Sequence, residues 1–173
     1  MNFQSEKTVV WNVDGYDLEI SNPQKLYWPK DGFTKMDILN YYKNMSAILL
    51  PYFKNRPTTL HYFPRGIEGF SFYKRDFEDV DEKGKLFRTA FYKEISQDKT
   101  IQVPLIDSAA GLLWFVSNGG IEFHLWSSKM PNYKNPDIAI FDLDASKEIG
   151  FENILKASWY LRMRRVRTFC AFL

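Results

Sequence analysis

Two short runs of hydrophobic and polar residues near the start of the chain predict a β-hairpin. Thr8–Val13 and Tyr16–Ser21 have the composition of strands, and Asp14-Gly15 separates them. Glycine supplies at little steric cost the positive φ that such a turn needs. Runs of residues with the composition of strands also predict an extended segment at 70–75 and strands at 58–63, 86–95, 100–103, 121–126 and 138–143.

The first helix is predicted between Lys35 and about Leu50, where apolar residues recur every three or four positions. Thr34 precedes this run and is expected to act as its N-cap. Asp37 lies in the first turn, where the helix dipole favours an acid. Pro51 marks the expected end, because proline interrupts the hydrogen bonding of a helix interior.

Two further helices follow at wide spacing. Asp107 is expected to cap a short helix that runs to about Asn118, where the pair Gly119-Gly120 stops it. Another helix is predicted from about Phe151. Predicted hairpins and helices therefore alternate along the chain. This order favours one α+β domain over residues 1–173, with a mixed sheet and flanking helices.

The amino-acid composition limits the class of protein but does not indicate a specific function. Of 173 residues, 45% are hydrophobic and 17% aromatic, and the net charge is only +2, so any basic binding site must be local. The one cysteine, Cys170, excludes an intrachain disulfide and suits the cytoplasm. No signal peptide is visible, and no apolar run approaches the ~20 residues of a membrane span. A cytoplasmic protein without a membrane partner is expected.

Two aspartates stand at the end of the apolar segment PDIAIFDLDAS, residues 136–146. If this segment is a strand, Asp142 and Asp144 point to the same face. Paired carboxylates repel each other, and a divalent cation such as Mg²⁺ or Mn²⁺ would relieve that repulsion. The alternatives are a strand that ends with two acids in solvent, or a phosphatase of the haloacid dehalogenase type. That family, however, places its motif early in the chain and usually follows it with Gly-Thr.

Four blocks of sequence, taken together, resemble one family. In order they are SNPQKLYWPKDGFTKMDILNYY, RPTTLHYFPRGIEGFSFYKRD, PLIDSAAGLLWFVSNGGIEFHLWSS and IAIFDLDAS. Over residues 17 to about 161 this series is similar to the polymerase domain of bacterial DNA ligase D, of the archaeo-eukaryotic primase superfamily. The resemblance implies a primase-polymerase-like fold.

The resemblance also implies an activity and its partners. Family members add nucleotides, often ribonucleotides, to broken or gapped DNA ends during non-homologous end joining. The expected partners are DNA and nucleoside triphosphates, together with Ku and ligase domains. The expected location is the cytoplasm, in association with the nucleoid. The family's metal-binding pair falls on Asp142 and Asp144, which would hold two Mn²⁺ or Mg²⁺ ions for catalysis.

The first block of the resemblance corresponds to the family's pocket for a DNA 5′-phosphate. Its lysines fall on Lys25 and Lys35 and its asparagine on Asn22. Two ammonium groups near a helix N-terminus are a sound phosphate site on physical grounds as well. The competing interpretation is a pair of solvated surface lysines.

The resemblance places four further residues at the nucleotide and template. Phe72 and Tyr73 match a stacking pair, Arg75 a basic residue near the phosphates, and His124 the histidine of the family's E-h-H strand. Taken alone, neighbouring aromatics and a lone strand histidine are more often structural. His61 and Tyr62 fall where basic residues are common in the family.

The sequence after the aspartate pair departs from the family. The Ser-Gly-Gly-Lys type block that holds the triphosphate and the third metal-binding aspartate are not found, and only Glu148 and Glu152 follow as acids. Residues 162–173 form an atypical tail. A reading frame disrupted near Arg162 would explain it, and a naturally short variant is the competing explanation. The chain by itself is therefore expected to be weakly active or inactive as a nucleotidyltransferase. The alternative function is a non-catalytic module that binds 5′-phosphorylated DNA ends.

Overall fold

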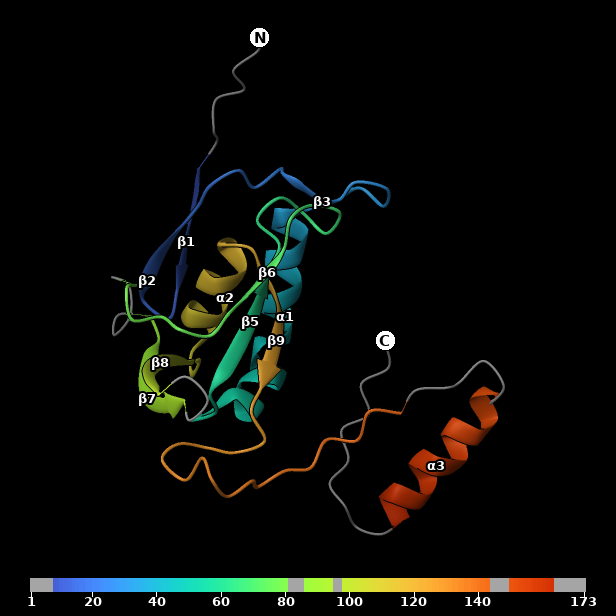
Figure 1. The fold of residues 1–173 in the computed structure, drawn as a ribbon. Helices are drawn as coiled ribbons and strands as arrows, with labels where there is room; N and C mark the ends of the chain where they lie inside the picture. Colours follow the sequence, from blue (N-terminus) through green and yellow to red (C-terminus); the bar gives the residue numbers. More distant parts are fainter. Residues whose placement is uncertain (1–7, 81–85, 95–97, 144–149, 164–173) are drawn as a thin grey trace. The chain divides into compact units, whose positions relative to one another are not determined.

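The computed structural model of the chain describes residues 8–80, 86–94, 98–143 and 150–163 (Figure 1). The chain falls into two compact units, residues 1–126 and residues 127–173. The expectation of one domain over all 173 residues stays a prediction.

Two hairpins open the first unit. β1 (Val9–Val13) pairs antiparallel with β2 (Tyr16–Ile20), and the turn residues Asp14 and Gly15 have φ of 52° and 81°. This hairpin confirms the sequence prediction. β3 (Leu26–Trp28) and β4 (Phe33–Thr34) form a second, shorter hairpin that the sequence analysis missed.

The first helix, α1, spans Lys35–Phe53 and begins as predicted. The Thr34 amide donates to Asp37 Oδ2 at 2.8 Å and the Asp37 amide donates to Thr34 Oγ1 at 3.3 Å, which makes a capping box. The predicted end at Pro51 was wrong. Proline removes one backbone donor only, and the Lys54 amide still donates to Leu50 at 3.0 Å. Buried Phe53 packs on Phe123, with ring centroids 5.5 Å apart, and so holds the last turn in place.

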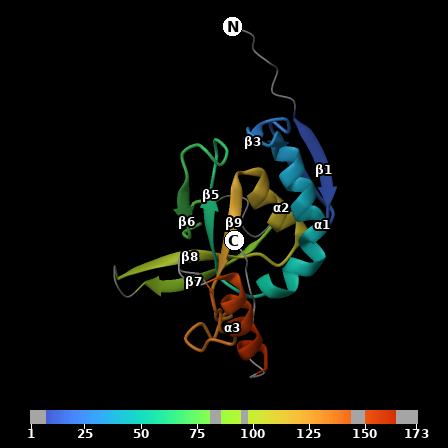
Figure 2. The same cartoon turned by 90° about the vertical axis from the view of Figure 1, so that its right-hand side faces the viewer.

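A three-stranded antiparallel sheet lies beside α1 and α2 (Figure 2). Its order is β6 (Phe72–Lys74), β5 (Thr58–Tyr62) and β9 (Gly120–Leu125). Leu60 of the central strand is fully buried, whereas His61 is only partly buried. One face of the sheet therefore belongs to the core and the other is open to solvent.

The remaining elements of the first unit are β7 (Arg88–Glu94), β8 (Lys99–Leu105) and α2 (Ala109–Ser117). The predicted cap of α2 was wrong by one residue. Ser108, not Asp107, accepts from the amide of Gly111, at 3.0 Å. Asp107 instead accepts from the Asn55 amide and from Arg88 Nε, each at 2.9 Å, because its side chain points back toward the end of α1 and the start of β7.

The hydrophobic core of the first unit draws its buried side chains from β1, β2, β3, α1, β5, α2 and β9 and from the loops that join them. Phe77 and Phe115 meet edge to face at 5.4 Å in its centre. The largest side chains that are almost wholly buried include Ile20, Leu39, Leu60, Phe77, Ile106, Leu112, Leu113 and Phe115. The α+β class is confirmed. Every strand pair among the described residues is antiparallel, so the mixed pairing expected from the sequence is not seen there.

The second unit contains an irregular segment and α3 (Phe151–Met163). The strand predicted at 138–143 is wrong, since these residues have no strand conformation in the structure. A strand needs a neighbour for its backbone groups. Here the amides of Asp137 and Ile138 both donate to the one carbonyl of Ser127, at 3.0 and 3.3 Å. Within the described ranges, no helix is long and apolar enough to cross a membrane.

Candidate nucleic-acid interface

The structure brings Asn22, Lys25 and Lys35 together around the start of α1. The Lys35 amide donates to the carbonyl of Lys25 at 2.8 Å, and the Lys25 amide donates to the carbonyl of Asn22 at 3.0 Å. Asn22 adopts a positive φ of 52°, which asparagine tolerates better than most residues. This turn places two lysines from separate segments beside each other.

Neither ammonium group in this lysine pair has a carboxylate partner within the described part of the chain. Lys25 Nζ donates to the carbonyl of Pro64, and Lys35 Nζ donates to that of Ser21 at 2.8 Å. Burial, and then the charge of Lys25, lower the pKa of Lys35 to about 8. A cation held out of water next to another cation is stabilised by a bound anion.

The open face of the β6–β5–β9 sheet carries Tyr73, His61 and His124. Tyr73 lies directly opposite His61 in the ladder, and their rings stack at 4.0 Å with 13° between the planes. His124 meets the edge of Tyr73 at 5.4 Å. Tyr73 remains 62% exposed, so much of it is free to stack with a ligand.

The other expected stacking residue, Phe72, lies on the opposite face. Its ring stacks on Tyr62 at 5.3 Å and on Phe70 at 5.7 Å. Burial raises the pKa of Tyr62, which thus behaves as a core phenol and not as part of a basic patch. Side chains alternate along a strand, so the neighbours Phe72 and Tyr73 cannot share one surface of β6.

Arg75 follows β6 and already has an acidic partner. Its Nη2 lies 2.5 Å from Oε1 of Glu94 at the end of β7, and the Glu94 side chain is only 10% exposed. The arginine therefore links β6 to β7. Its side chain is still 45% exposed, which leaves part of the guanidinium accessible.

Glu122 is the residue of this face that the sequence analysis missed. It lies across the ladder from His61, with Oε2 2.7 Å from His61 Nδ1, and it shares the face with His124 two residues later. The spacing of Glu122 and His124 in a predicted strand indicates a shared face. Only the register of β5 against β9 reveals the contact with His61.

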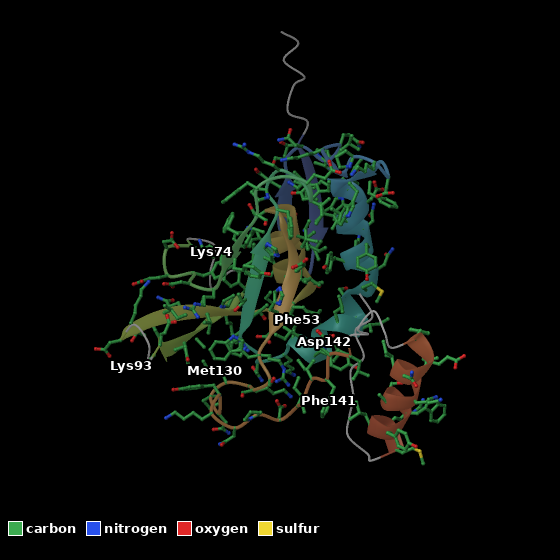
Figure 3. The ribbon with its side chains drawn as sticks, turned by 45° about the vertical axis from the view of Figure 1, so that its right-hand side comes forward. Phe53, Lys74, Lys93, Met130, Phe141 and Asp142 are labelled. Carbon is green, nitrogen blue, oxygen red and sulfur yellow. The ribbon has the colours of Figure 1, made fainter. Side chains whose placement is uncertain are left out.

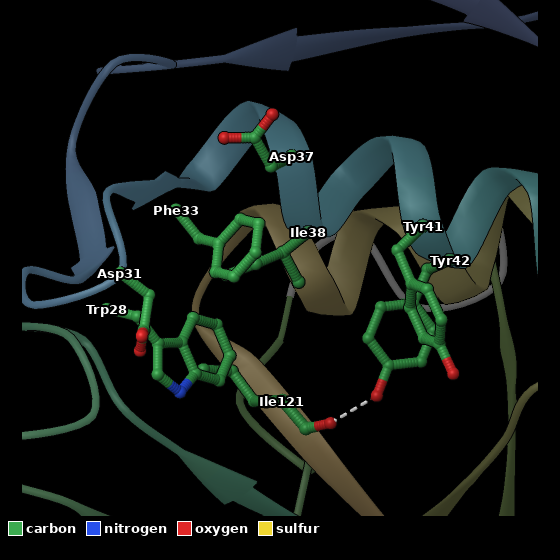
Figure 4. A pocket seen from close by; sticks show the side chains of 8 residues that line it. All are labelled: Trp28, Asp31, Phe33, Asp37, Ile38, Tyr41, Tyr42 and Ile121. Atoms are coloured by element: carbon green, nitrogen blue, oxygen red, sulfur yellow. Dashed lines mark hydrogen bonds between the residues drawn. The ribbon is translucent and has the colours of Figure 1, made fainter.

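A pocket of about 460 Å³ lies between the β3–β4 hairpin, α1 and β9 (Figure 4). The hairpin contributes Trp28, Asp31 and Phe33, the helix contributes Asp37, Ile38, Tyr41 and Tyr42, and the strand contributes Ile121. The Tyr42 hydroxyl donates to the carbonyl of Ile121, and burial raises its pKa to about 12. Four of the eight lining residues are aromatic and two are isoleucines, so the pocket offers flat apolar surfaces close in sequence to Lys25 and Lys35.

The predicted metal ligands belong to the second unit. Asp142 is exposed on the irregular segment after Ser127 (Figure 3). Asp144 lies outside the described residues. The expectation that both carboxylates project from one face of a strand loses its basis, because residues 138–143 are not a strand.

A model of the LigD primase-polymerase domain family matches residues 34–166. The chain belongs to this family. The match spans α1 to α3 and includes Lys35, Tyr73, His124 and both aspartates of the pair. The family predicted from the four sequence blocks is thus confirmed.

Sequence relatives of this LigD primase-polymerase domain are end-joining proteins from bacteria. The multifunctional non-homologous end joining protein LigD of Mycolicibacterium smegmatis is 21% identical over 159 residues, or 88% of this chain. LigD of Mycobacterium tuberculosis is 28% identical over 153 residues, or 84% of the chain. The chain spans 20% of the length of each of these relatives.

The fold is also found in a solved structure. The polymerase domain of Mycobacterium tuberculosis ligase D in complex with DNA matches with a TM-score of 0.60 and 27% identity. The match covers 65% of this chain and 38% of that one. The predicted primase-polymerase-like fold is confirmed by this similarity.

Proposed function

We propose that this LigD primase-polymerase domain binds 5′-phosphorylated DNA ends and takes part in nucleotidyl transfer to them during non-homologous end joining. The observation that carries the proposal is the lysine pair Lys25 and Lys35, formed in a chain of this family and paired with no carboxylate of residues 8–80, 86–94, 98–143 or 150–163. The solved relative, a polymerase domain in complex with DNA, supports a nucleic acid as the ligand.

The 5′-phosphate would take the place next to Lys25 and Lys35. A phosphate carries two charges and three acceptor oxygens, so it accepts hydrogen bonds from both ammonium groups at once. Both lysines now donate to backbone carbonyls, and they would exchange or share these bonds with the phosphate. Asn22 is exposed on the same turn and offers an amide donor.

Tyr73 would supply a stacking surface for a base of the DNA or of an incoming nucleoside triphosphate. Stacking on an aromatic ring contributes about 1–3 kcal/mol for each base and tolerates any sequence. His124 lies at the ring edge and Arg75 beyond the strand end, where both can approach phosphate groups. Phe72 would support this face from behind through its contact with Tyr62.

Asp142 and Asp144 would hold the Mg²⁺ or Mn²⁺ ions of the transfer reaction. The donor set fits these ions, because both prefer carboxylate oxygens. Such ions, when bound, activate an attacking hydroxyl and stabilise the leaving phosphate. Ku and a DNA ligase are further partners that we propose from the end-joining relatives.

The binding step is tested by fluorescence anisotropy on gapped DNA with and without a 5′-phosphate. The wild-type chain should prefer the phosphorylated gap, and Lys25→Met and Lys35→Met should each remove most of that preference. Lys30→Met is the matched control, since Lys30 lies in the same region but is 85% exposed and paired with Glu68. Equal binding of both DNAs by the wild type would refute the proposed phosphate site.

Primer extension with Mn²⁺ separates the polymerase from the non-catalytic alternative. That alternative is favoured by one observation: the lysine pair lies within residues 1–126, whereas Asp142 and Asp144 lie outside that unit. Extension that Asp142→Asn abolishes would establish catalysis. Phosphate-dependent binding with no extension would instead identify a module that holds DNA ends.

A further inference from the structure

We propose that His61, Glu122 and His124 form a binding site for a divalent transition-metal ion, with Zn²⁺ as the best match. The site uses none of the ligands of the proposed aspartate pair, and it does not depend on the DNA-binding function proposed above. Its three side chains project from the open face of the β6–β5–β9 sheet.

Distances among the three side chains suit one ion. Glu122 Oε2 lies 2.7 Å from His61 Nδ1 and 3.5 Å from His124 Nε2. The three residues together offer one ligand atom each, all within 4.8 Å of one another. Ligand atoms around a tetrahedral Zn²⁺ lie about 3.4 Å apart, given bonds of about 2.0–2.2 Å. Small rotations of Glu122 and His124, both about half exposed, would therefore complete the geometry.

The sheet holds the ligands in this arrangement. His61 and Glu122 face each other across the β5–β9 ladder, and Glu122 and His124 are two residues apart on the same strand face. The His61 ring lies between two aromatic rings, with centroids 4.0 Å from Tyr73 and 4.2 Å from Phe63. The His61 side chain is only 14% exposed, so its orientation is set before any ion arrives.

The choice of residues selects the type of metal. Two imidazoles and one carboxylate are ligands that Zn²⁺ and its neighbours in the transition series accept, whereas Mg²⁺ prefers oxygen atoms. Three protein ligands leave a fourth position for water or for an oxygen of an anion. The chain has only two histidines, and both belong to this cluster.

The alternative is that the cluster is an ion-pair network without a metal, in which Glu122 accepts from both rings. Such a network would bind Zn²⁺ no better than other surface acids do. Titration calorimetry of the untagged chain with zinc chloride distinguishes the two. The Cys170→Ser background removes the one thiol that competes for Zn²⁺.

One Zn²⁺ should bind per chain in this background. His61→Gln, Glu122→Gln and His124→Gln should each weaken binding by at least about tenfold, as even changes around metal ligands often do. Glu68→Gln is the matched control, because Glu68 is an exposed glutamate whose partner is Lys30. Zinc affinities of the three variants equal to that of the control would overturn the proposal, as would no stoichiometric binding by the parent chain.

Nitrogen-15 NMR of the imidazole rings provides a test that needs no variant at the site. With two histidines, only two rings contribute signals. Zn²⁺ should shift Nδ1 of His61 and Nε2 of His124, the two atoms nearest Glu122. Ring signals that do not move with added Zn²⁺ would refute the site even if the substituted chains failed to fold.

Discussion

Lys35 shows how folding changes the chemistry of a single side chain. Its Cα begins α1, and its ammonium group is turned inward, so that the residue is only 6% exposed. Burial and the neighbouring Lys25 lower its pKa to about 8. An ordinary surface lysine would stay charged throughout the physiological range, whereas this one loses its charge just above it.

The proposed phosphate site should therefore weaken with rising pH. Lys35 is protonated below about pH 8 and neutral above it, so the positive charge that attracts phosphate is lost as pH rises. A bound phosphate would raise the pKa of Lys35 and so delay the loss. We expect the ratio of affinities for phosphorylated and unphosphorylated gaps to fall between pH 7 and 9.5, measured by anisotropy at constant salt. A flat ratio would contradict the role of Lys35, and Lys30→Met should follow the wild type.

The same pKa predicts a pH dependence of stability. Between about pH 8 and 10.5 the unfolded chain keeps the Lys35 proton while the folded chain has released it, so the free energy of unfolding rises with pH. Lys35→Met removes this contribution. The difference in melting temperature between wild type and Lys35→Met should shift in favour of the wild type from pH 8 to 10. A difference that stays constant would show that the pKa of Lys35 is not lowered.

Tyr73 can be tested at the same scale. Tyr73→Phe keeps the ring that stacks on His61, whereas Tyr73→Ala removes it. Loss of one base–aromatic stack costs about 1–3 kcal/mol, so Tyr73→Ala should weaken DNA binding about fivefold or more, and Tyr73→Phe should leave it nearly unchanged. Anisotropy with gapped DNA measures both. Equal affinities for the two variants would mean that the Tyr73 ring does not contact a base.

At the scale of elements, α2 approaches the chain before β7 closely. A Cβ added at Gly111 would lie 2.5 Å from the carbonyl oxygen of Leu86. Ser108 joins the same two residues, since it accepts from the Gly111 amide and its hydroxyl donates to Leu86 at 3.1 Å. Glycine is a poor helix former, and here it is required by packing.

Gly111→Ala should destabilise the fold although alanine favours helices. The gain in helix propensity is about 1 kcal/mol, whereas overpacking typically costs about 1–3 kcal/mol and the clash here is with backbone. We expect a lower midpoint of urea unfolding. Gly150→Ala is the control, because no atom of the described part of the chain lies within 4 Å of its added Cβ. A midpoint for Gly111→Ala at or above that of the wild type would show that α2 can move away from Leu86.

At the scale of the whole molecule, the core and the predicted site residues divide between the two units. The core cluster and the partly buried residues packed on it lie between residues 11 and 125. Asn22, Lys25, Lys35, Tyr73 and His124 lie in the same unit, and only the aspartate pair lies in residues 127–173. Stability and phosphate binding should therefore be separable from catalysis.

A chain that ends after Trp126 should still fold and bind phosphorylated DNA ends. All members of the core cluster found among the described residues lie before Trp126, so we expect one cooperative thermal transition by circular dichroism and the same preference for a 5′-phosphate as the full chain. It should show no primer extension, since it lacks Asp142 and Asp144. A truncated chain without cooperative unfolding would show that residues 127–173 are needed for the core.

Local patterns in the sequence predicted much of the fold. The Asp14-Gly15 turn, the Thr34 cap and the strand at 58–63 depend on neighbours a few residues away, so they can be recognised without a structure. Predictions failed where a residue far away in the sequence decides the local conformation. Pro51 did not end α1 because Phe53 is held by Phe123. Residues 138–143 are not a strand, and the amides of Asp137 and Ile138 donate to the carbonyl of Ser127 instead of entering a ladder.

By itself, the sequence determined the family, the α+β class and the residues proposed for DNA phosphate, stacking and metal. Only the tertiary structure decided how they group. It buried Lys35 beside Lys25, separated Phe72 from Tyr73 across a sheet, and joined His61 to Glu122 and His124. The physical reason is that register and burial arise when segments far apart in the chain pack together, and the side chains that face one another are set by that packing.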